Sequence, residues 1–141
     1  MPAGNTDPRG VAGIGIDIVE NRRVEDALAR HGRRFRNRIF RKSEQDYCDQ
    51  KARPALHYAS RFAVKEAVAK AFGTGIGAEL GWLDIEVVRD GGGAPVVMML
   101  GKGAELARKM NIDRIYVSLS HTHQYAAATA LLAVKCPRGP A

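Results

Sequence analysis

Two carboxylates in this sequence stand in stretches where a hydrophobic core would not require them. Asp17 interrupts the apolar run GIGIDIVE (13–20), and Glu66 lies in the helix-like run RFAVKEAVAKAFGTGIG (61–77). If they met at about 4 Å, they would repel each other by roughly 4 kcal/mol at an effective dielectric constant of about 20, so a positive group would have to lie between them. Carboxylates without a paired histidine or cysteine favour a hard ion such as Mg²⁺, held partly by water and by substrate phosphate. The alternative is an Asp17 at the surface or at the cap of the next helix.

The helix-like run also carries lysines and ends in a loop of alternating glycines. Glu66 and Lys70 are four residues apart, so their alternative role is an exposed ion pair worth about 0.2–0.5 kcal/mol. Gly73, Gly75 and Gly77 cost conformational entropy, but they let a backbone approach a ligand, and exposed N–H groups suit phosphate oxygens. The loop is neither a Walker A motif nor a G-x-G-x-x-G run that opens a helix, so by itself it is weak evidence of phosphate binding.

A third polar group lies near the end of the chain, in SLSHTHQYA (118–126). His121 and His123 could bind zinc, but two histidines without a third ligand are weak evidence of such a site. A histidine beside a phosphate fits the other two groups better. The alternative is a turn histidine whose ring bonds a backbone carbonyl.

The excess of positive charge is concentrated in one segment. The chain holds 22 Lys and Arg against 15 Asp and Glu, a net charge of +7, and residues 22–42 alone hold nine basic and two acidic residues, which is again +7. Such a local field attracts an anionic partner, which could be a nucleic acid, an anionic lipid or an acidic protein. A solvated helix face is the alternative. Only 6% of the residues are aromatic and no recognition motif is present, which disfavours nucleic acid.

The remaining bulk properties indicate one cytoplasmic domain. A chain of 141 residues can bury one core, and it has no apolar run of about 18 residues that would span a membrane. The N-terminus lacks the apolar segment of a secretory signal. Cys48 and Cys136 have no metal or redox spacing, so we expect reduced thiols. We expect residues 11–135 to form the domain, between a flexible N-terminal extension at 1–10 and a flexible tail at 136–141.

Alternation and helical spacing predict the elements of this domain. In residues 13–20 the isoleucines share one face of a strand, and the glycines and Asp17 share the other. We expect strands at 13–20, 83–88, 95–100, 114–120 and 125–134. We expect helices at 21–32, capped by Asn21, at 44–51, capped by Ser43, at 55–72 and at 102–110. This order predicts a single α+β domain with a mostly antiparallel sheet and a long central helix.

Taken together, the three polar groups resemble those of a known family. GIGIDIVE, RFAVKEAVAKAFGTGIG and VSLSHTHQYAAA closely resemble the holo-acyl-carrier-protein synthases, the small bacterial type of 4′-phosphopantetheinyl transferase, and the likeness runs from about residue 11 to 134. The resemblance implies the α+β fold of the 4′-phosphopantetheinyl transferases. It also implies a homotrimer with active sites between neighbouring subunits, and a cytoplasmic role in fatty acid biosynthesis, a branch of lipid metabolism.

The resemblance implies a reaction and a set of site residues. The Mg²⁺-dependent enzymes of this family transfer 4′-phosphopantetheine from coenzyme A to a serine of apo-acyl carrier protein, and adenosine 3′,5′-bisphosphate leaves. Asp17 and Glu66 would hold Mg²⁺, and Lys70 would neutralise phosphate charge or assist proton transfer, which makes these three the catalytic residues. Coenzyme A would be contacted by Arg53, Arg61, Lys70, Gly73, Thr74, Gly75 and His121. The acidic carrier protein would dock on Arg23, Arg30 and Arg34.

Two other functions stay open beside this one. A nucleic-acid-binding module built on residues 22–42 would bind any duplex with a steep salt dependence. A transferase of broader range would also modify carrier domains within longer synthases. An inactive protein that keeps only the fold is disfavoured, because Asp17, Glu66 and Lys70 are all present.

Overall fold

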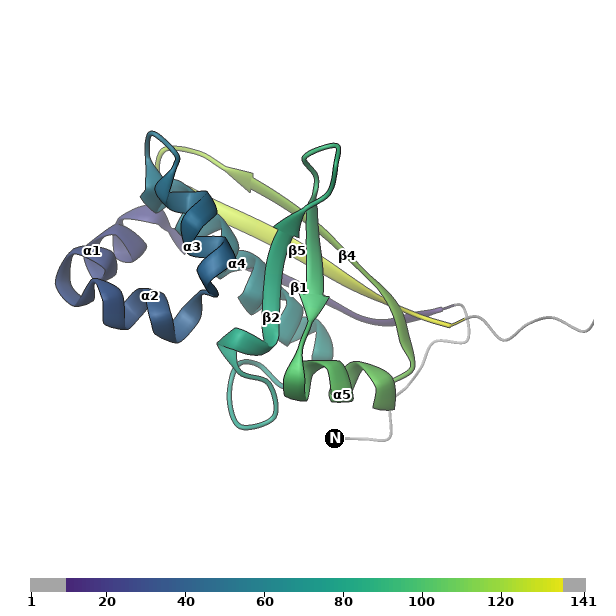
Figure 1. Cartoon of the computed structure of the whole chain (residues 1–141). Helices are drawn as coiled ribbons and strands as arrows, with labels where there is room; N and C mark the ends of the chain where they lie inside the picture. Colours follow the sequence, from purple (N-terminus) through teal and green to yellow (C-terminus); the bar gives the residue numbers. More distant parts are fainter. Residues whose placement is uncertain (1–9, 136–141) are drawn as a thin grey trace, which may run out of the picture.

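The computed structural model describes residues 10–135 of the chain (Figure 1). Its strands form two antiparallel sheets, one of three strands in the order β1-β5-β4 and one of two strands, β2-β3. The strands are β1 (Val11–Glu20), β2 (Ile85–Arg89), β3 (Pro95–Met99), β4 (Ile112–His121) and β5 (Tyr125–Val134). The helices are α1 (Asn21–His31), α2 (Arg33–Ile39), α3 (Lys42–Asp49), α4 (Pro54–Phe72), the 3-10 helix η1 (Trp82–Asp84) and α5 (Gly101–Lys109). The predicted α+β class is therefore confirmed.

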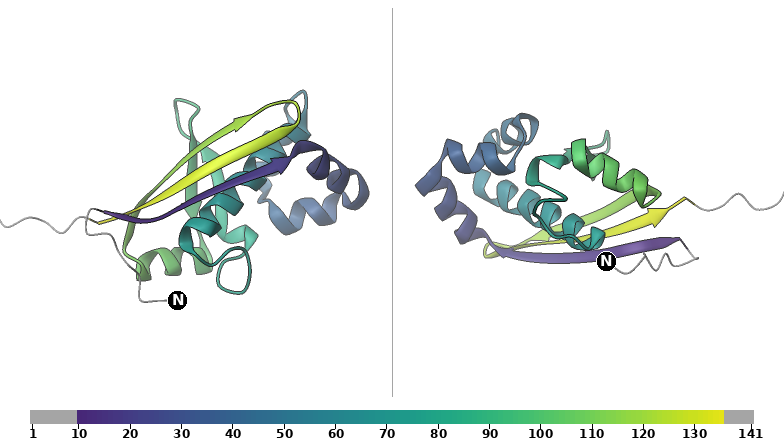
Figure 2. Two further views of the ribbon diagram at one scale, coloured as in Figure 1. Left: turned by 180° about the vertical axis from the view of Figure 1, so that it is seen from behind. Right: turned by 90° about the horizontal axis from the view of Figure 1, so that it is seen from below.

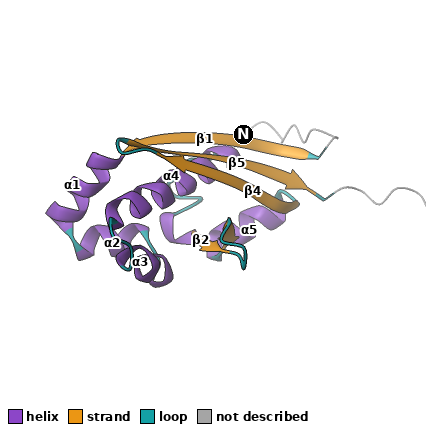
Figure 3. Ribbon diagram, turned by 90° about the horizontal axis from the view of Figure 1, so that it is seen from above, coloured by secondary structure: helices purple, strands orange, loops and turns teal. Residues whose placement is uncertain are grey.

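Helix α4 is the centre of the fold and lies along one face of the three-stranded sheet (Figure 3). It begins with Pro54, which is tolerated in a first turn, and it ends at Gly73, whose φ of 81° forms a left-handed cap. Its apolar residues pack against small side chains of β5 such as Ala128 and Ala130, which are 1% exposed. Helices α1, α2 and α3 gather at one end of α4, and α5 lies at the other (Figures 1 and 2).

Two glycines let β1 approach α4 more closely than any other residue would allow. A Cβ built on Gly13 would lie 2.0 Å from the carbonyl oxygen of Ala71, and one built on Gly15 would lie 2.0 Å from that of Ala67. Side chains alternate along a strand, so Asp17 lies on the same face as these glycines. The face that carries Asp17 is therefore pressed against the helix that carries Glu66.

The other face of the three-stranded sheet is apolar and exposed in the single chain. Ile14, Ile16 and Ile18 of β1 are 72%, 66% and 66% exposed, and Tyr116 of β4 is 53% exposed. None of the described helices covers this face (Figures 2 and 3). Three adjacent exposed isoleucines on one strand form an apolar patch of the kind that marks an interaction site.

Helices α1 to α3 attach to α4 through a second group of buried side chains. Its members include Val24 of α1, Ile39 and Phe40 at the end of α2, Cys48 of α3 and Tyr58 of α4. Cys48 is a free thiol and is fully buried. Cys136 lies outside the described residues. This group of buried residues fixes the arginine-rich helices at one end of the sheet.

Several boundaries and caps differ from the sequence-based predictions. Helix α2 was not predicted. The predicted helix at 44–51 begins at Lys42, after Arg41 and not after a cap at Ser43. Asn21 is the first residue of α1 and not its cap. Its amide instead donates to the carbonyls of Thr122 and His123 at 2.9 and 3.2 Å, so it joins α1 to the turn between β4 and β5.

The proposed domain limits and termini are only partly described. Regular structure runs from Val11 to Val134, and Gly10 accepts a hydrogen bond from the Val134 amide. The predicted tails, residues 1–9 of the extension and 136–141, lie outside the described residues. Within residues 10–135, no helix combines the length and apolar character needed to cross a membrane.

Candidate active site

Asp17 and Glu66 lie in one cleft. Asp17 comes from β1 and Glu66 from the middle of α4, and both line a cavity of about 420 Å³ together with Arg23 of α1. Phe35 and Phe62 form apolar parts of its lining. The close contact between β1 and α4 therefore brings together the two residues that the sequence suggests as metal ligands.

Lys70 completes this group from the next turn of α4. Its Nζ donates to Oδ1 of Asp17 at 2.9 Å and to the carbonyl oxygen of Ile16 at 3.0 Å. Half of the lysine side chain is exposed, whereas that of Asp17 is 15% exposed. Lys70 thus pairs with Asp17 on the neighbouring strand. The alternative role, an exposed ion pair with Glu66 on the same helix, would have required a different partner.

The cleft holds Glu66 in an environment that disfavours its charge. Burial raises the pKa of Glu66 above its ordinary value, the Asp17 carboxylate raises it further, and Lys70 opposes the shift. A cation between the two carboxylates would relieve this repulsion. Among the described residues, no group of three or more His, Cys, Asp and Glu side chains could hold a metal. Mg²⁺ needs only one or two carboxylates together with water and phosphate, so this pair fits that ion.

Arg61 lies at the centre of a separate cluster of positive side chains. It is 3% exposed, and its guanidinium lies 4.0 Å from the centre of the Tyr47 ring. Lys51 and Arg89 lie over the same ring at 4.5 and 5.1 Å. Nε of Arg61 is buried with no hydrogen-bond partner among the described residues. Because an unpaired buried donor is costly, the cluster favours an anion such as phosphate.

His121 lies at the end of β4, on the edge of this positive cluster. The centre of its ring is 6.3 Å from that of His57 of α4. Burial lowers the pKa of His57, and the charges of Arg61 and its neighbours lower it further. Two of the predicted coenzyme A contacts, Arg61 and His121, therefore share one region with His57.

Arg53 lies elsewhere, just before α4. Its Nη1 is 3.1 Å from Nδ1 of His123, and it lines a second cavity of about 770 Å³ beside Arg22 and Gln124. The structure thus divides the predicted coenzyme A contacts of one chain between separate regions.

The glycine loop does not present the amides that the sequence suggested. The N–H of Gly73 donates to the carbonyl of Lys70 at 2.9 Å, that of Gly75 to Ala69 at 3.1 Å, and that of Gly77 to Leu80 at 2.9 Å. The bonds of Gly73 and Gly75 close the end of α4, so these amides are engaged within the chain. The contact of this loop with coenzyme A stays a prediction. Thr74 Oγ1 donates to the Gly75 carbonyl at 2.8 Å.

The three predicted docking arginines are spread over α1 and α2. Arg23 is exposed and lines the carboxylate cleft. Arg30 lies in the last turn of α1. Arg34 lines a neighbouring groove of about 450 Å³ with Arg38 and Trp82. Only Arg23 is therefore next to the two carboxylates.

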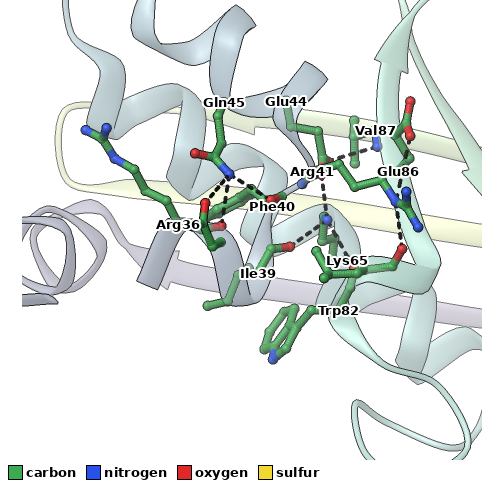
Figure 4. Close-up of polar contacts among 12 residues, drawn as sticks. Arg36, Ile39, Phe40, Arg41, Glu44, Gln45, Lys65, Trp82, Glu86 and Val87 are labelled. Carbon is green, nitrogen blue, oxygen red and sulfur yellow. Dashed lines mark hydrogen bonds and ion pairs between the residues drawn. The ribbon is translucent and has the colours of Figure 1, made fainter. Parts of the chain in front are cut away.

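Lys65, which the sequence reasoning did not use, lies beside Glu66 in the chain but points into the core. It is fully buried and pairs with Glu44 of α3 at 2.7 Å (Figure 4). A signal was available, because Lys65 lies three residues before the buried Val68 and seven before the buried Phe72, on the apolar side of the helix. Other missed residues come from segments without a motif: Tyr47, Lys51, His57 and Arg89.

The sequence matches a known family over most of its length. A family model described as the 4′-phosphopantetheinyl transferase superfamily matches residues 13–130. The holo-[acyl-carrier-protein] synthase of Moorella thermoacetica is 47% identical over 118 residues, which cover 84% of this chain and 91% of that protein. The synthase of Protochlamydia amoebophila is 44% identical over 119 residues, which cover 84% of this chain and 95% of that protein.

Solved structures give the same result for the fold. The structure of Neisseria meningitidis holo-[acyl-carrier-protein] synthase matches with a TM-score of 0.81 and 30% identity, over 86% of this chain and 98% of that one. The Helicobacter pylori synthase in complex with coenzyme A matches with a TM-score of 0.77 and 34% identity, over 85% and 99% of the two chains. These matches confirm the resemblance and the predicted fold. The chain therefore belongs to the 4′-phosphopantetheinyl transferase superfamily, as one of the holo-[acyl-carrier-protein] synthase enzymes.

Proposed function

We propose that this enzyme transfers 4′-phosphopantetheine from coenzyme A to a serine of apo-acyl carrier protein, releases adenosine 3′,5′-bisphosphate, and serves fatty acid biosynthesis. The observation that carries the proposal is the cleft in which Asp17 and Glu66 lie beside Arg23. Relatives of this chain are named for the same activity. The comparisons give no support to the alternative of nucleic-acid binding through residues 22–42.

The chemistry asks for alignment and charge neutralisation more than for covalent catalysis. The bond broken is the pyrophosphate of coenzyme A, and phosphoryl transfer depends on positioning and on electrostatic stabilisation. Asp17 and Glu66 would hold Mg²⁺, which would supply positive charge to the phosphate oxygens. Lys70, fixed by its bond to Asp17, adds charge at the same place. The serine proton can pass to a carboxylate of the cleft.

Binding of coenzyme A is assigned first to the positive cluster around Arg61, which lies over Tyr47 of α3. Arg61 supports this assignment best, because it is buried inside a positive cluster and its Nε has no hydrogen-bond partner within residues 10–135. His121 borders that cluster, and Arg53, Lys70, Gly73, Thr74 and Gly75 complete the proposed contacts. Since the glycine amides are used within the chain, Gly73 and Gly75 would act by leaving room and not by donating hydrogen bonds.

The acidic carrier would dock on the arginine-rich helices. Arg23, Arg30 and Arg34 are exposed on α1 and α2, and Arg23 is at the mouth of the carboxylate cleft. Charges at the rim of an interface mainly raise the association rate, and salt screens them. Transfer at low carrier concentration should therefore slow as ionic strength rises.

The exposed isoleucine face supports a homotrimer. Ile14, Ile16 and Ile18 would be covered by further copies of the same chain, because a patch of this kind is unfavourable in water. Asp17 lies on the opposite face of the same strand, and β1 is at the edge of its sheet. A subunit that covers the isoleucines and extends past this edge would therefore reach the cleft. This placement fits active sites between neighbouring subunits.

Intact mass spectrometry of a purified apo-acyl carrier protein tests the reaction. Incubation with the enzyme, coenzyme A and Mg²⁺ should add one phosphopantetheine to the carrier, and a chelator should prevent the addition. Asp17→Ala and Glu66→Ala should each remove most of the transfer while the protein stays folded. Glu105→Ala, which removes an exposed carboxylate of α5, is the matched control. Near-normal transfer by the Asp17 and Glu66 variants would exclude the metal assignment, and no transfer by the wild type would exclude the reaction.

A further inference from the structure

Lys65 is a fully buried ammonium group with every donor in use. Its Nζ donates to the carbonyls of Ile39 at 2.7 Å and Trp82 at 3.1 Å and to Oε1 of Glu44 at 2.7 Å (Figure 4). An ammonium group has three donors, so no further bond is available to it. Glu44 is 1% exposed, which makes this an ion pair inside the protein.

Glu44 extends the network to two further segments. Its Oε1 also accepts from the amide of Arg41 at 2.8 Å, and its Oε2 accepts from the amide of Val87 at 3.0 Å. The side chain of Arg41 then donates to the carbonyl of Leu83 at 2.9 Å. The pair thus joins α4 to the end of α2, the start of α3, η1 and β2 (Figure 4).

Stability alone is a weak reason for such a pair. Burial removes the hydration of both charges, and replacement of a buried ion pair by apolar residues of similar volume is often neutral or stabilising. Hydrogen bonds to fixed backbone oxygens, however, hold segments in one relative position, which packing alone specifies less sharply. The question is therefore what these segments carry.

The segments that Lys65 holds carry the apolar wall of the carboxylate cleft. Phe35 lies one turn before Ile39 on α2, and it lines the cleft. Phe62 lines the cleft as well, and its ring packs at a tilt of 32° against that of Trp82, with 4.8 Å between the ring centres. Lys65 thus fixes the cleft wall through Ile39 on one side and through Trp82 on the other.

We propose that Lys65, paired with Glu44, is a positioning residue that aligns the docking helix α2 and the apolar wall of the cleft with the carboxylates on α4 and β1. The inference rests on the proposed function, because its consequence is that the carrier serine enters the cleft in line with coenzyme A. Two consecutive residues of α4 then have different roles. Lys65 acts toward the carrier protein, and Glu66 acts toward the metal.

The coenzyme A side of the site has further contacts of its own, although α3 and β2, which carry Tyr47 and Arg89, also take part in the network. The close approach of Gly13 and Gly15 to α4 holds β1, and with it Asp17, against that helix. The later part of α3, which carries Tyr47, is held by a bond of 2.8 Å from the Tyr58 hydroxyl to Asp49. Loosening the network at Lys65 should therefore disturb the reaction with the carrier much more than the binding of coenzyme A.

The double variant Lys65→Met/Glu44→Gln tests this difference. It removes both charges and keeps similar volumes, which cores tolerate best. Lys42→Met, which removes an exposed lysine of α3 that pairs with Asp46, is the matched control. Thermal unfolding would report folding, intact mass would give kcat and KM for the carrier, and calorimetry would give the Kd and stoichiometry of coenzyme A. We expect carrier kcat/KM to fall roughly tenfold or more, the Kd to change less than about threefold, and the stoichiometry to stay unchanged.

Each other outcome would overturn the proposal or the function beneath it. A folded double variant with carrier kcat/KM close to that of the wild type would exclude a positioning role, and so would equal losses toward carrier and coenzyme A. If the double variant does not fold, Arg41→Gln decides, because it loosens the bond to Leu83 and the ion pair with Glu86 and leaves the buried pair in place. It should still lower carrier kcat/KM, and unchanged kcat/KM would overturn the proposal. Absence of transfer by the wild type would instead refute the proposed function.

Discussion

Replacement of Gly15 by alanine should separate the two elements that carry the candidate metal ligands. The new Cβ would lie 2.0 Å from the carbonyl oxygen of Ala67 and 2.8 Å from the amide nitrogen of Ala71. Real Cβ atoms essentially never come within 3.0 Å of such atoms, so β1 and α4 would have to move apart by about 1 Å. Both opposing atoms belong to the backbone of a buried helix, so neither can turn away as a side chain would.

The displacement should reduce both stability and activity. Overpacking of a dense interior costs typically 1–3 kcal/mol. Because the opposing atoms belong to a rigid backbone, we expect the free energy of unfolding to fall by about 3 kcal/mol, which lowers Tm by roughly 10 °C for a chain of this size. The Asp17–Lys70 bond of 2.9 Å would lengthen to roughly 3.9 Å, which is too long for a hydrogen bond. Because a misplacement of about 1 Å can cost roughly a hundredfold in rate, we expect transfer to fall by that order.

Urea unfolding followed by circular dichroism would give the free energy of unfolding, and intact mass at a temperature where the variant is folded would give the rate. Gly77→Ala is the matched control, because a Cβ there would meet nothing within 4 Å. It should change the free energy of unfolding by less than about 1 kcal/mol and leave the rate unchanged. A Gly15→Ala protein with wild-type stability and wild-type rate would refute the reasoning that close backbone contact builds the site.

Four other residues give shorter tests. Burial and Asp17 raise the pKa of Glu66, and a metal binds only the ionised carboxylate. The affinity for Mg²⁺, measured by calorimetry in the presence of coenzyme A, should therefore fall as the pH decreases through that raised pKa. Glu66→Gln should flatten this pH dependence. Burial raises the pKa of Cys48 to about 12, so iodoacetamide should label it, as followed by mass spectrometry, only when urea unfolds the protein. Arg23→Glu should raise KM for the carrier with little change in the Kd of coenzyme A; equal losses would argue against docking on α1. Ile16→Glu should convert a trimer into monomers in analytical ultracentrifugation, and a trimer that persists would contradict the proposed use of that face.

The fold could be predicted where its signals are local. Alternation in residues 13–20 and helical spacing in residues 61–72 are strong periodic patterns, and both elements were found. Helix α2 was missed because its seven residues include only two apolar ones, Phe35 and Ile39. A helix this short depends on tertiary packing, here against the group around Phe40 and Tyr58, and such contacts leave no periodic signal.

The site was predictable only in part, for a similar reason. Asp17 and Glu66 stood out because each departs from an apolar pattern. The pairing of Lys65 with Glu44 spans 21 residues, and the positive cluster around Arg61 collects side chains from separate segments, so neither has a sequence spacing to recognise. The hydrogen bonds of the glycine loop could not be predicted either, because no spacing in the sequence indicates that the amides of Gly73 and Gly75 donate to carbonyls of α4.

The spacing of small residues explains why Asp17 meets Glu66 and not another residue of α4. Gly13 lies against Ala71 and Gly15 against Ala67, so two residues along the strand, about 6.6 Å, match four along the helix, about 6 Å. If this spacing continues for two more strand residues, Asp17 lies opposite Ala63. Glu66 is three residues after Ala63, so it lies on the neighbouring row of the helix surface. The next residue along the helix from Glu66 in that row is Lys70, which reaches back to Asp17. Insertion of one residue between Gly15 and Asp17 would therefore turn Asp17 to the isoleucine face and remove the site, although both carboxylates would still be present.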